Sequence, residues 1–109
     1  MSGKQTRDKG RRGESEAKKL LASRDYTILA DTSAGLSTGD LIARSPDGVV
    51  YDIEVKNRRV VNVPMFVGQA RKNAERSKVA WMVMAKIDST SSWLVLRKGK
   101  YPVVWNAKG

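Results

Sequence analysis

Hydrophobic and polar residues alternate over residues 49–56, where the chain reads VVYDIEVK. Successive side chains of a strand point to opposite sides, so the two sets separate. The apolar side carries Val49, Tyr51, Ile53 and Val55, and the other side carries Val50, Asp52, Glu54 and Lys56. The pattern predicts a strand with one face in a core and two acids and an amine on the other.

The rest of the chain predicts two helices and four further strands. Residues 14–24 are good helix formers with acids in the first turn, and a second helix begins after an Asn62 cap with Pro64 in its first turn. Strands are predicted at residues 26–30, 40–44, 79–85 and 93–97, and the apolar run 79–85 indicates a strand covered on both faces. We therefore expect an α/β fold with a central mixed five-stranded sheet flanked by helices, in the order α-β-β-β-α-β-β.

A turn and a terminal segment complete the organisation. Ser45-Pro46-Asp47-Gly48 has Pro at the second and Gly at the fourth position, which predicts an antiparallel hairpin between the second and third strands. Residues 1–13 are polar and basic without a hydrophobic period, so we predict a flexible basic arm there and a single domain over residues 14–109. The three tryptophans lie in apolar runs and are expected in a core or an interface: Trp81, Trp93 and Trp105.

The charge balance indicates a polyanionic partner. The chain has 21 Lys and Arg against 11 Asp and Glu, a formal net charge of +10 and a pI near 10.2. Nucleic acid is the first expectation and a membrane surface the competitor. No stretch approaches the roughly 20 apolar residues of a spanning helix, and the N-terminus lacks the apolar region of a secretory signal. We therefore expect a soluble, cytoplasmic protein.

Two residue types are missing altogether, and their absence narrows the chemistry. The chain has no Cys and no His, which excludes disulfides, thiolate zinc sites, cysteine nucleophiles and the commonest general base. An enzyme built from this chain has carboxylates, Lys, Arg, Tyr and hydroxyls, for which the matching cofactor is a hard cation such as Mg²⁺.

The predicted hairpin brings two of these carboxylates together. Asp40 begins the strand that pairs with the Glu54 strand, and two like charges held close need a cation or a proton to relieve them. Lys56, two residues beyond Glu54 on the same face, is placed to reach a phosphate at such a cation, so the set can activate water without His. The plain alternative is a solvated edge strand. For Asp52, which shares the Glu54 face but lies deeper along the hairpin, we expect a surface salt bridge.

These residues resemble a known nuclease signature. Gly39-Asp40 followed by Glu54-Val55-Lys56 is similar to the Asp and Glu-x-Lys elements of the PD-(D/E)XK nuclease superfamily, with Gly39 where the family has Pro. Within it, the likeness is greatest to archaeal-type Holliday junction resolvases, on a Lys9–Glu14 segment leading into a helix and a Thr32–Gly35 loop before the Asp strand. The likeness spans about residues 9–85 and implies a restriction-endonuclease-like core.

The resemblance also implies roles for individual residues. Asp40 and Glu54 would hold Mg²⁺, with Mn²⁺ as a substitute, and the Val55 carbonyl is a possible third ligand. Lys56 would orient or activate the attacking water. Glu14 would lie near the metal, with Glu16 as its rival, and both acids have the alternative role of stabilising the helix dipole. Gln69 is either a further active-site residue or an ordinary exposed helix residue.

Basic and hydroxyl side chains on both sides of these motifs are the expected DNA contacts. Recognition of shape and phosphate is expected, because no aromatics are interleaved with base-reading groups. The predicted contacts are Lys9, Arg11, Arg12, Ser33, Arg58, Arg59, Arg71, Lys72 and Arg76.

The sequence thus predicts a metal-dependent endodeoxyribonuclease, selective for DNA structure, of the kind that acts in recombination and repair on branched or duplex DNA. A homodimer with two active sites is expected, and the apolar segment Tyr101–Trp105 is its candidate contact. The alternative is a non-catalytic basic nucleic-acid-binding module, of which a ribosomal component is one form.

Overall fold

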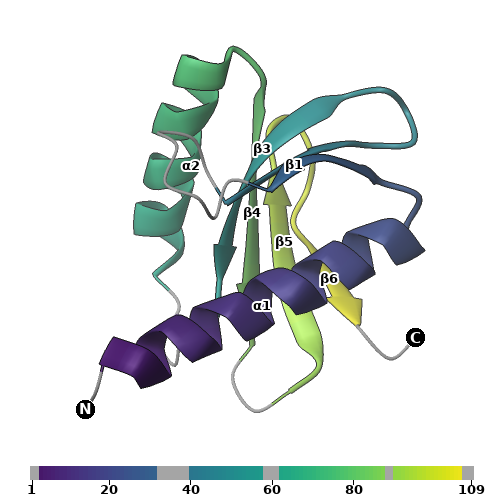
Figure 1. The fold of residues 1–109 in the computed structure, drawn as a ribbon. Helices are drawn as coiled ribbons and strands as arrows, with labels where there is room; N and C mark the ends of the chain where they lie inside the picture. Colours follow the sequence, from purple (N-terminus) through teal and green to yellow (C-terminus); the bar gives the residue numbers. More distant parts are fainter. Residues whose placement is uncertain (1–2, 32–39, 58–61, 88–89, 107–109) are drawn as a thin grey trace.

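The computed structural model is an α/β fold in which two helices enclose a six-stranded mixed sheet (Figure 1). It describes residues 3–31, 40–57, 62–87 and 90–106, and of residues 3–12 and 77 the backbone alone. The elements in chain order are α1 (Gly3–Ser23), β1 (Thr27–Asp31), β2 (Leu41–Arg44), β3 (Val50–Lys56), α2 (Val63–Ser77), β4 (Ala80–Lys86), β5 (Ser92–Arg97) and β6 (Val103–Asn106).

The strands lie side by side in their sequence order, β1 to β6. Neighbouring strands are antiparallel except for β3 and β4, which are parallel and are joined through α2. A parallel pair needs a long crossover connection, and a helix is its usual form. Helix α2 is therefore fixed against the strand that carries Glu54.

The β2–β3 hairpin forms at the predicted turn. Gly48 has a φ of +89°, which suits a residue without a Cβ, and its N–H donates to the Ser45 carbonyl at 2.9 Å. The Ser45 hydroxyl donates to the Asp47 carboxylate and accepts from the Val49 N–H at 3.1 Å. The register places Leu41 opposite Ile53, so the start of β2 lies beside the second half of β3.

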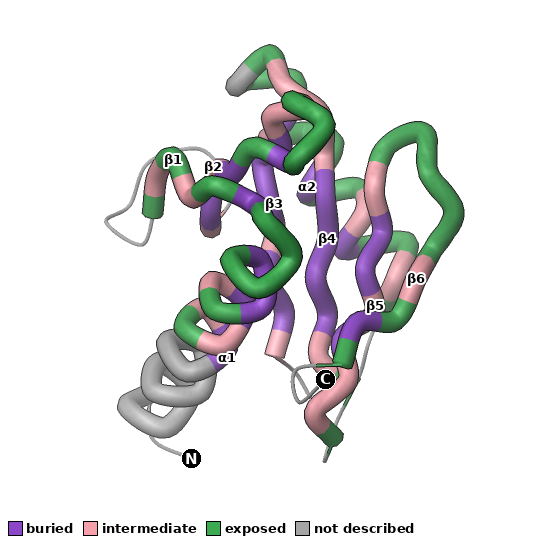
Figure 2. The backbone as a smooth tube through the Cα atoms, turned by 90° about the vertical axis from the view of Figure 1, so that its right-hand side faces the viewer, coloured by how far each residue is buried: buried purple, intermediate pink, exposed green. Residues whose placement is uncertain are grey.

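Helix α1 covers one face of the sheet and seals the larger core (Figure 2). Its apolar stripe of Ala17, Leu20 and Leu21 is buried against the side of β3 that the alternation predicted to be apolar. The other strands add the remaining core side chains, among them Leu41, Met82, Met84, Trp93, Val95 and Trp105.

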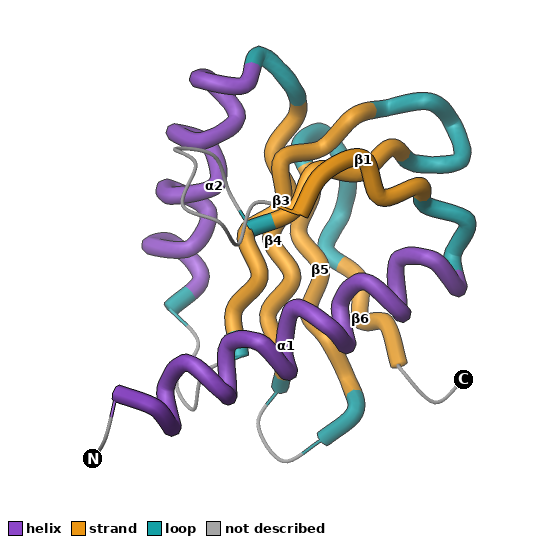
Figure 3. The backbone as a smooth tube through the Cα atoms, viewed as in Figure 1, coloured by secondary structure: helices purple, strands orange, loops and turns teal. Residues whose placement is uncertain are grey.

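Helix α2 covers the opposite face, on which the polar side of β3 lies (Figure 3). Phe66 and Ala70 pack on Val83 and Ala85 of β4, so β4 is buried on both faces as predicted. The Asn62 side chain accepts from the Met65 N–H at 3.2 Å, which confirms the predicted cap. Since α2 covers this face, the side chains of Asp52, Glu54 and Lys56 are largely shielded from solvent.

The predicted five-strand count is wrong, because residues 103–106 add a sixth strand next to β5. Trp105 pairs with Trp93 and is 6% exposed in the larger core, so it does not belong to an exposed dimer contact at Tyr101–Trp105. Tyr101, Pro102 and Val104 are the exposed residues of that segment, with Tyr101 at 90% and Val104 at 59%. The apolar run is explained by burial of alternate residues against α1 and the sheet.

Helix α1 begins at Gly3, whereas the sequence predicted its start at Glu14 after an irregular arm. Lys, Arg and Gln are themselves good helix formers, so a helix anchored by the packed residues 17–21 can extend through a basic segment that has no hydrophobic period. No helix in the part of the chain described is both long and apolar enough to cross a membrane.

Gly13 sets how closely α1 approaches the end of β3. A Cβ placed on Gly13 would lie 2.7 Å from the Cβ of Asn57, the residue that follows β3. Gly to Ala inside a helix normally stabilises it by about 1 kcal/mol. Here we expect Gly13→Ala to destabilise the protein by about 1–2 kcal/mol, because the helix must move away from the strand. Urea denaturation measures the change, and adding Asn57→Gly should restore part of it; a stabilised Gly13→Ala protein would contradict the close contact.

Candidate active site

Asp40 is held against β3 by two hydrogen bonds to the backbone of that strand, one from its own N–H and one to its carboxylate. Its N–H donates to the Ile53 carbonyl at 2.9 Å, and its Oδ2 accepts from the Val55 N–H at 2.8 Å. The hairpin register therefore extends one residue beyond β2 and places the Asp40 carboxylate beside Glu54. Val55 itself points into the larger core, so its backbone and not its side chain faces this region.

Glu54 is the centre of a nearly buried polar cluster. Its Oε1 lies 3.0 Å from the Lys56 ammonium, and its Oε2 accepts from the Asn73 amide at 3.0 Å. The side chains of Lys56 and Glu54 are only 10% and 12% exposed. The Lys56 ammonium also lies 5.4 Å from the centre of the Phe66 ring. Strand β3 and helix α2 thus hold the Glu54 carboxylate in one orientation, with a cation attached.

The surroundings of Asp40 raise the pKa of its carboxyl group. Burial raises the pKa of Asp40 to about 6, and the Glu54 carboxylate adds to the rise, whereas the Val55 N–H and Lys56 oppose it. Glu14, on α1, shares this environment, because burial first and then the Asp40 charge raise its pKa. The three carboxylates are therefore close enough to repel one another.

Replacing Asp40 with Asn should stabilise the metal-free protein at neutral pH. A carboxyl whose folded-state pKa lies above its ordinary 3.8 binds its proton more tightly when folded, so stability is lost as the pH rises from about 4 through 6. Asn keeps the acceptor for Val55 and carries no charge. Between pH 4 and 7, we expect the unfolding free energy of Asp40→Asn to rise relative to that of wild type by about 1–2 kcal/mol. A fully buried carboxyl would give a larger difference, but the Asp40 side chain is partly exposed.

Urea denaturation at several pH values measures this difference. The control is Asp47→Asn, because the Ser45 hydroxyl lowers the pKa of Asp47 and its pH dependence should have the opposite sign. If the difference in unfolding free energy between wild type and Asp40→Asn did not change with pH, the pKa of Asp40 would not be raised in the folded protein.

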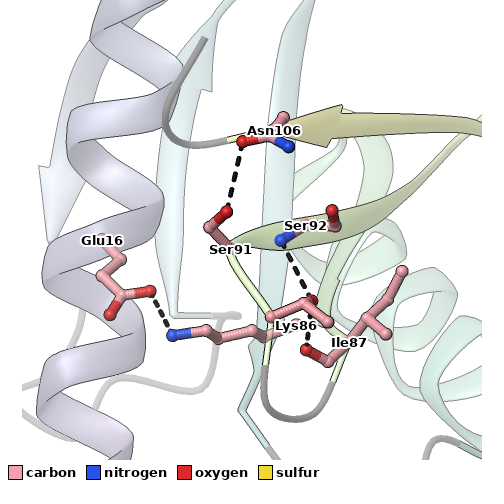
Figure 4. A network of polar contacts seen from close by, with 7 residues as sticks. Glu16, Lys86, Ile87, Ser91, Ser92 and Asn106 are labelled. Carbon is pink, nitrogen blue, oxygen red and sulfur yellow. Dashed lines mark hydrogen bonds and ion pairs between the residues drawn. The ribbon is translucent and has the colours of Figure 1, made fainter.

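The structure separates the two candidate acids of α1. Glu16 forms an ion pair with Lys86 at the end of β4, with 2.7 Å between Oε2 and Nζ (Figure 4). Glu14 instead lies within the electrostatic reach of Asp40 and Glu54, at the point where Gly13 contacts the end of β3. The preference for Glu14 over Glu16 as the helix carboxylate agrees with this arrangement.

On α2 the polar residue that reaches the cluster is Asn73, which the sequence analysis missed. Gln69 is exposed, and Asn73, one turn further along, donates to Glu54. A signal was present: Asn73 precedes Ala74 and follows Ala70 by three residues, and both alanines pack towards the sheet. A polar residue next to this small-residue stripe is in a position to meet the polar face of β3.

Asp52 is not the exposed residue that the sequence analysis expected. It is 1% exposed under α2, because the whole polar face of β3 is covered. It is one of the charges that raise the pKa of Asp40.

The predicted DNA contacts are only partly within the described residues. Arg71, Lys72 and Arg76 lie on α2 and are exposed. Ser33, Arg58 and Arg59 lie outside the described residues, as do the side chains of Lys9, Arg11 and Arg12. Of the predicted DNA contacts, the structure therefore locates the three exposed cations of α2.

The arrangement is compatible with a hard divalent cation. Asp40 and Glu54 are two partly shielded carboxylates, and burial first and then the Glu54 charge raise the pKa of Asp40. Oxygen donors of this kind suit Mg²⁺ or Mn²⁺. Within residues whose side chains are described, no three acidic groups stand close enough to form a ready-made metal site. Both oxygens of Glu54 already contact protein donors, so cation binding there would have to displace or share Lys56 or Asn73.

Comparison with known proteins adds no family assignment. A scan against protein-family models finds no match, and a search of curated proteins finds no significant relative.

Proposed function

We propose that this protein is a metal-dependent endonuclease that hydrolyses DNA phosphodiester bonds, with Asp40, Glu54 and Lys56 as the catalytic set. The observation that carries the proposal is the pair of carboxylates on adjacent strands, Asp40 and Glu54, with the Lys56 ammonium 3.0 Å from Glu54. The helix–hairpin–helix–strand order around this set supports a restriction-endonuclease-like core, as the resemblance to PD-(D/E)XK nucleases implies.

Each residue has a distinct task in this proposal. A bound Mg²⁺ would supply a Lewis acid and a more acidic water, and Asp40 and Glu54 would hold it. Lys56, kept in place by Glu54 and by the Phe66 ring, would orient the attacking water or offset the charge that grows on the phosphate. Glu14 would lie at the edge of the site, and Asn73 would fix the orientation of Glu54.

DNA and a second copy of the chain are the proposed partners. The net charge of +10 and the exposed cations of α2 support DNA. Two copies would supply two sites for paired cuts at a branched substrate. Sedimentation of the protein with and without a four-way junction tests the dimer, and a monomer in both cases would exclude the two-site arrangement.

The non-catalytic nucleic-acid-binding module is the competing function, and one observation favours it. Glu54 is satisfied by Lys56 and Asn73 within the protein, as expected for a structural ion pair.

Cleavage assays distinguish the two. The purified protein is incubated with a labelled four-way junction, a flap, a linear duplex and single-stranded DNA, in Mg²⁺ or EDTA, beside Asp40→Asn. Metal-dependent cutting that the variant lacks supports the nuclease, and the preferred substrate defines its selectivity. Binding of these substrates without cutting, in Mg²⁺ and in Mn²⁺, would support the module.

A further inference from the structure

A groove runs along the side of α2 that faces away from Asn73. Two adjoining hollows of about 610 and 470 Å³ share Val67 and Trp81, so together they form one continuous depression between α2 and the region that links β5 to β6. We call it the Trp81 groove and define it by Val67, Arg71, Lys78, Trp81, Lys98 and Tyr101.

Helix geometry separates this groove from the candidate active site. Val67, Arg71 and Glu75 line the groove at spacings of four residues, which places them along one side of α2, and Lys78 follows as the C-cap residue. Asn73 is two residues after Arg71, about 200° further round the helix, and contacts Glu54. The groove and the Glu54 cluster therefore lie on either side of the same helix.

The groove combines cations with aromatic surface. Arg71, Lys78 and Lys98 are exposed along it, and Glu75 is the acid among its lining residues. Lys100 lines the far end, where it is 3.6 Å from Asp47 in an exposed ion pair of small energetic weight. Partly buried Trp81 lies in both hollows, and Tyr101, which is 90% exposed, lies at the far end.

This combination suits an unpaired nucleic-acid strand. Grooves that bind single strands follow the backbone with cations and stack the bases on aromatic rings, whereas an intact duplex keeps the faces of its bases hidden. Arg71 and Lys78 on the α2 side and Lys98 on the β5 side are exposed cations that match the phosphates of a strand, and Trp81 and Tyr101 offer aromatic surface at two points of the groove.

We propose that the Trp81 groove binds a single strand of DNA, with bases stacked on Trp81 and Tyr101 and phosphates at Arg71, Lys78 and Lys98. The choice of DNA rests on the proposed function; the stacking and phosphate contacts rest on the groove itself. A substrate that occupies both sides of α2 would have a strand to be cut near Glu54 and an unpaired segment in the groove. Branched DNA with a single-stranded arm is the substrate class that meets both requirements.

The test measures binding in EDTA, so that it does not depend on cleavage. Labelled oligothymidylate is titrated with the wild-type protein, Tyr101→Ala and Lys98→Ala, with Lys19→Ala on the opposite side of the sheet as the matched charge control. Tyr101→Ala should raise the Kd by roughly 5-fold or more, since stacking of one base contributes about 1–3 kcal/mol. Lys98→Ala should reduce the slope of log K against log salt by about 0.7, and Lys19→Ala should leave it unchanged.

Tryptophan fluorescence provides a second readout. Trp93 and Trp105 are 0% and 6% exposed, so quenching by oligothymidylate should come from Trp81. Trp81→Phe keeps an aromatic ring, and it should remove the quenching while retaining most of the affinity.

Three results would overturn the proposal. One is an unchanged Kd in Tyr101→Ala together with an unchanged salt slope in Lys98→Ala. Another is tighter binding of a duplex than of the single strand through the same residues. The third is a protein dimer that Tyr101→Ala dissociates without any effect on oligothymidylate binding. If the variants bind oligothymidylate as expected but the protein cuts no DNA, the groove assignment remains and the nuclease is excluded.

Discussion

Glu54→Gln is expected to reduce metal-dependent DNA cleavage by about 10³-fold or more, the equivalent of about 4 kcal/mol of transition-state stabilisation. The substitution removes the negative charge and retains the shape of the side chain. One amide oxygen can still accept from Lys56, and the amide of Asn73, which offers an oxygen as well as an NH₂, can turn to accept from the new NH₂ group. The polar cluster should therefore survive while its affinity for a divalent cation falls.

The matched control is Glu16→Gln, which makes the same change in a glutamate that is ion-paired to Lys86. Single-turnover cleavage in Mg²⁺ and binding in EDTA are measured for both variants, and circular dichroism checks that both are folded. Glu16→Gln should cleave at nearly the wild-type rate, and both should bind DNA at least as well as wild type, since each loses a negative charge. If Glu54→Gln retained more than a tenth of the wild-type rate, Glu54 would not be a metal ligand of the proposed nuclease.

Lys56→Met is expected to lower the unfolding free energy of the metal-free protein by about 3 kcal/mol. Removing one partner of a buried ion pair leaves the other charge without compensation, and this typically costs about 3–5 kcal/mol. The Glu54 side chain is only 12% exposed and would keep Asn73 as its hydrogen-bond donor. The methionine fills most of the volume of the lysine chain, so the loss would reflect charge more than packing.

A double-mutant cycle isolates this electrostatic contribution. Lys56→Met is measured alone and combined with Glu54→Gln, and the combined variant should be more stable than the sum of the two single changes predicts. Lys86→Met serves as the exposed counterpart, because its partner Glu16 is 41% exposed and the pair should contribute less than about 1 kcal/mol. Equal effects at Lys56 and Lys86 in urea denaturation would mean that the Glu54 environment is as hydrated as the surface.

These predictions together describe a site that is arranged at some expense of stability. Asp40 and Glu54 lie close together and partly out of water, and burial together with the Glu54 charge raises the pKa of Asp40. Lys56 offsets part of the repulsion through its contact with Glu54. A protein in which Asp40→Asn gains stability while losing cleavage would show that the repulsion is retained for function.

Local signals were sufficient for the hairpin and for the elements next to it. The alternation over residues 49–56, the Pro46–Gly48 turn and the Asn62 cap each depend on neighbouring residues, and the structure has all three as expected. The same signals placed Asp40 next to Glu54, since an antiparallel register follows from the turn. The hypothesis about the site was therefore available without any tertiary information.

Other features were decided by contacts between segments that are distant in the chain. Strand β6 is short and follows Pro102, so its alternating pattern was only a weak indication of a strand. The pairing of Trp105 with Trp93 establishes it. The partner of Glu16 is Lys86, which lies seventy residues further along the chain. Asn73 became part of the site only through the placement of α2 over β3.

The sequence by itself determined the two faces of β3, the turn that brings Asp40 to Glu54, and a chemistry without Cys or His in a basic chain. The tertiary structure alone decided that the polar face of β3 is covered by α2, which buries Asp52 and gives Glu54 its two protein partners. The physical reason is that alternation and turn preference act over a few residues, whereas burial and pKa depend on whatever another part of the chain places on the exposed side.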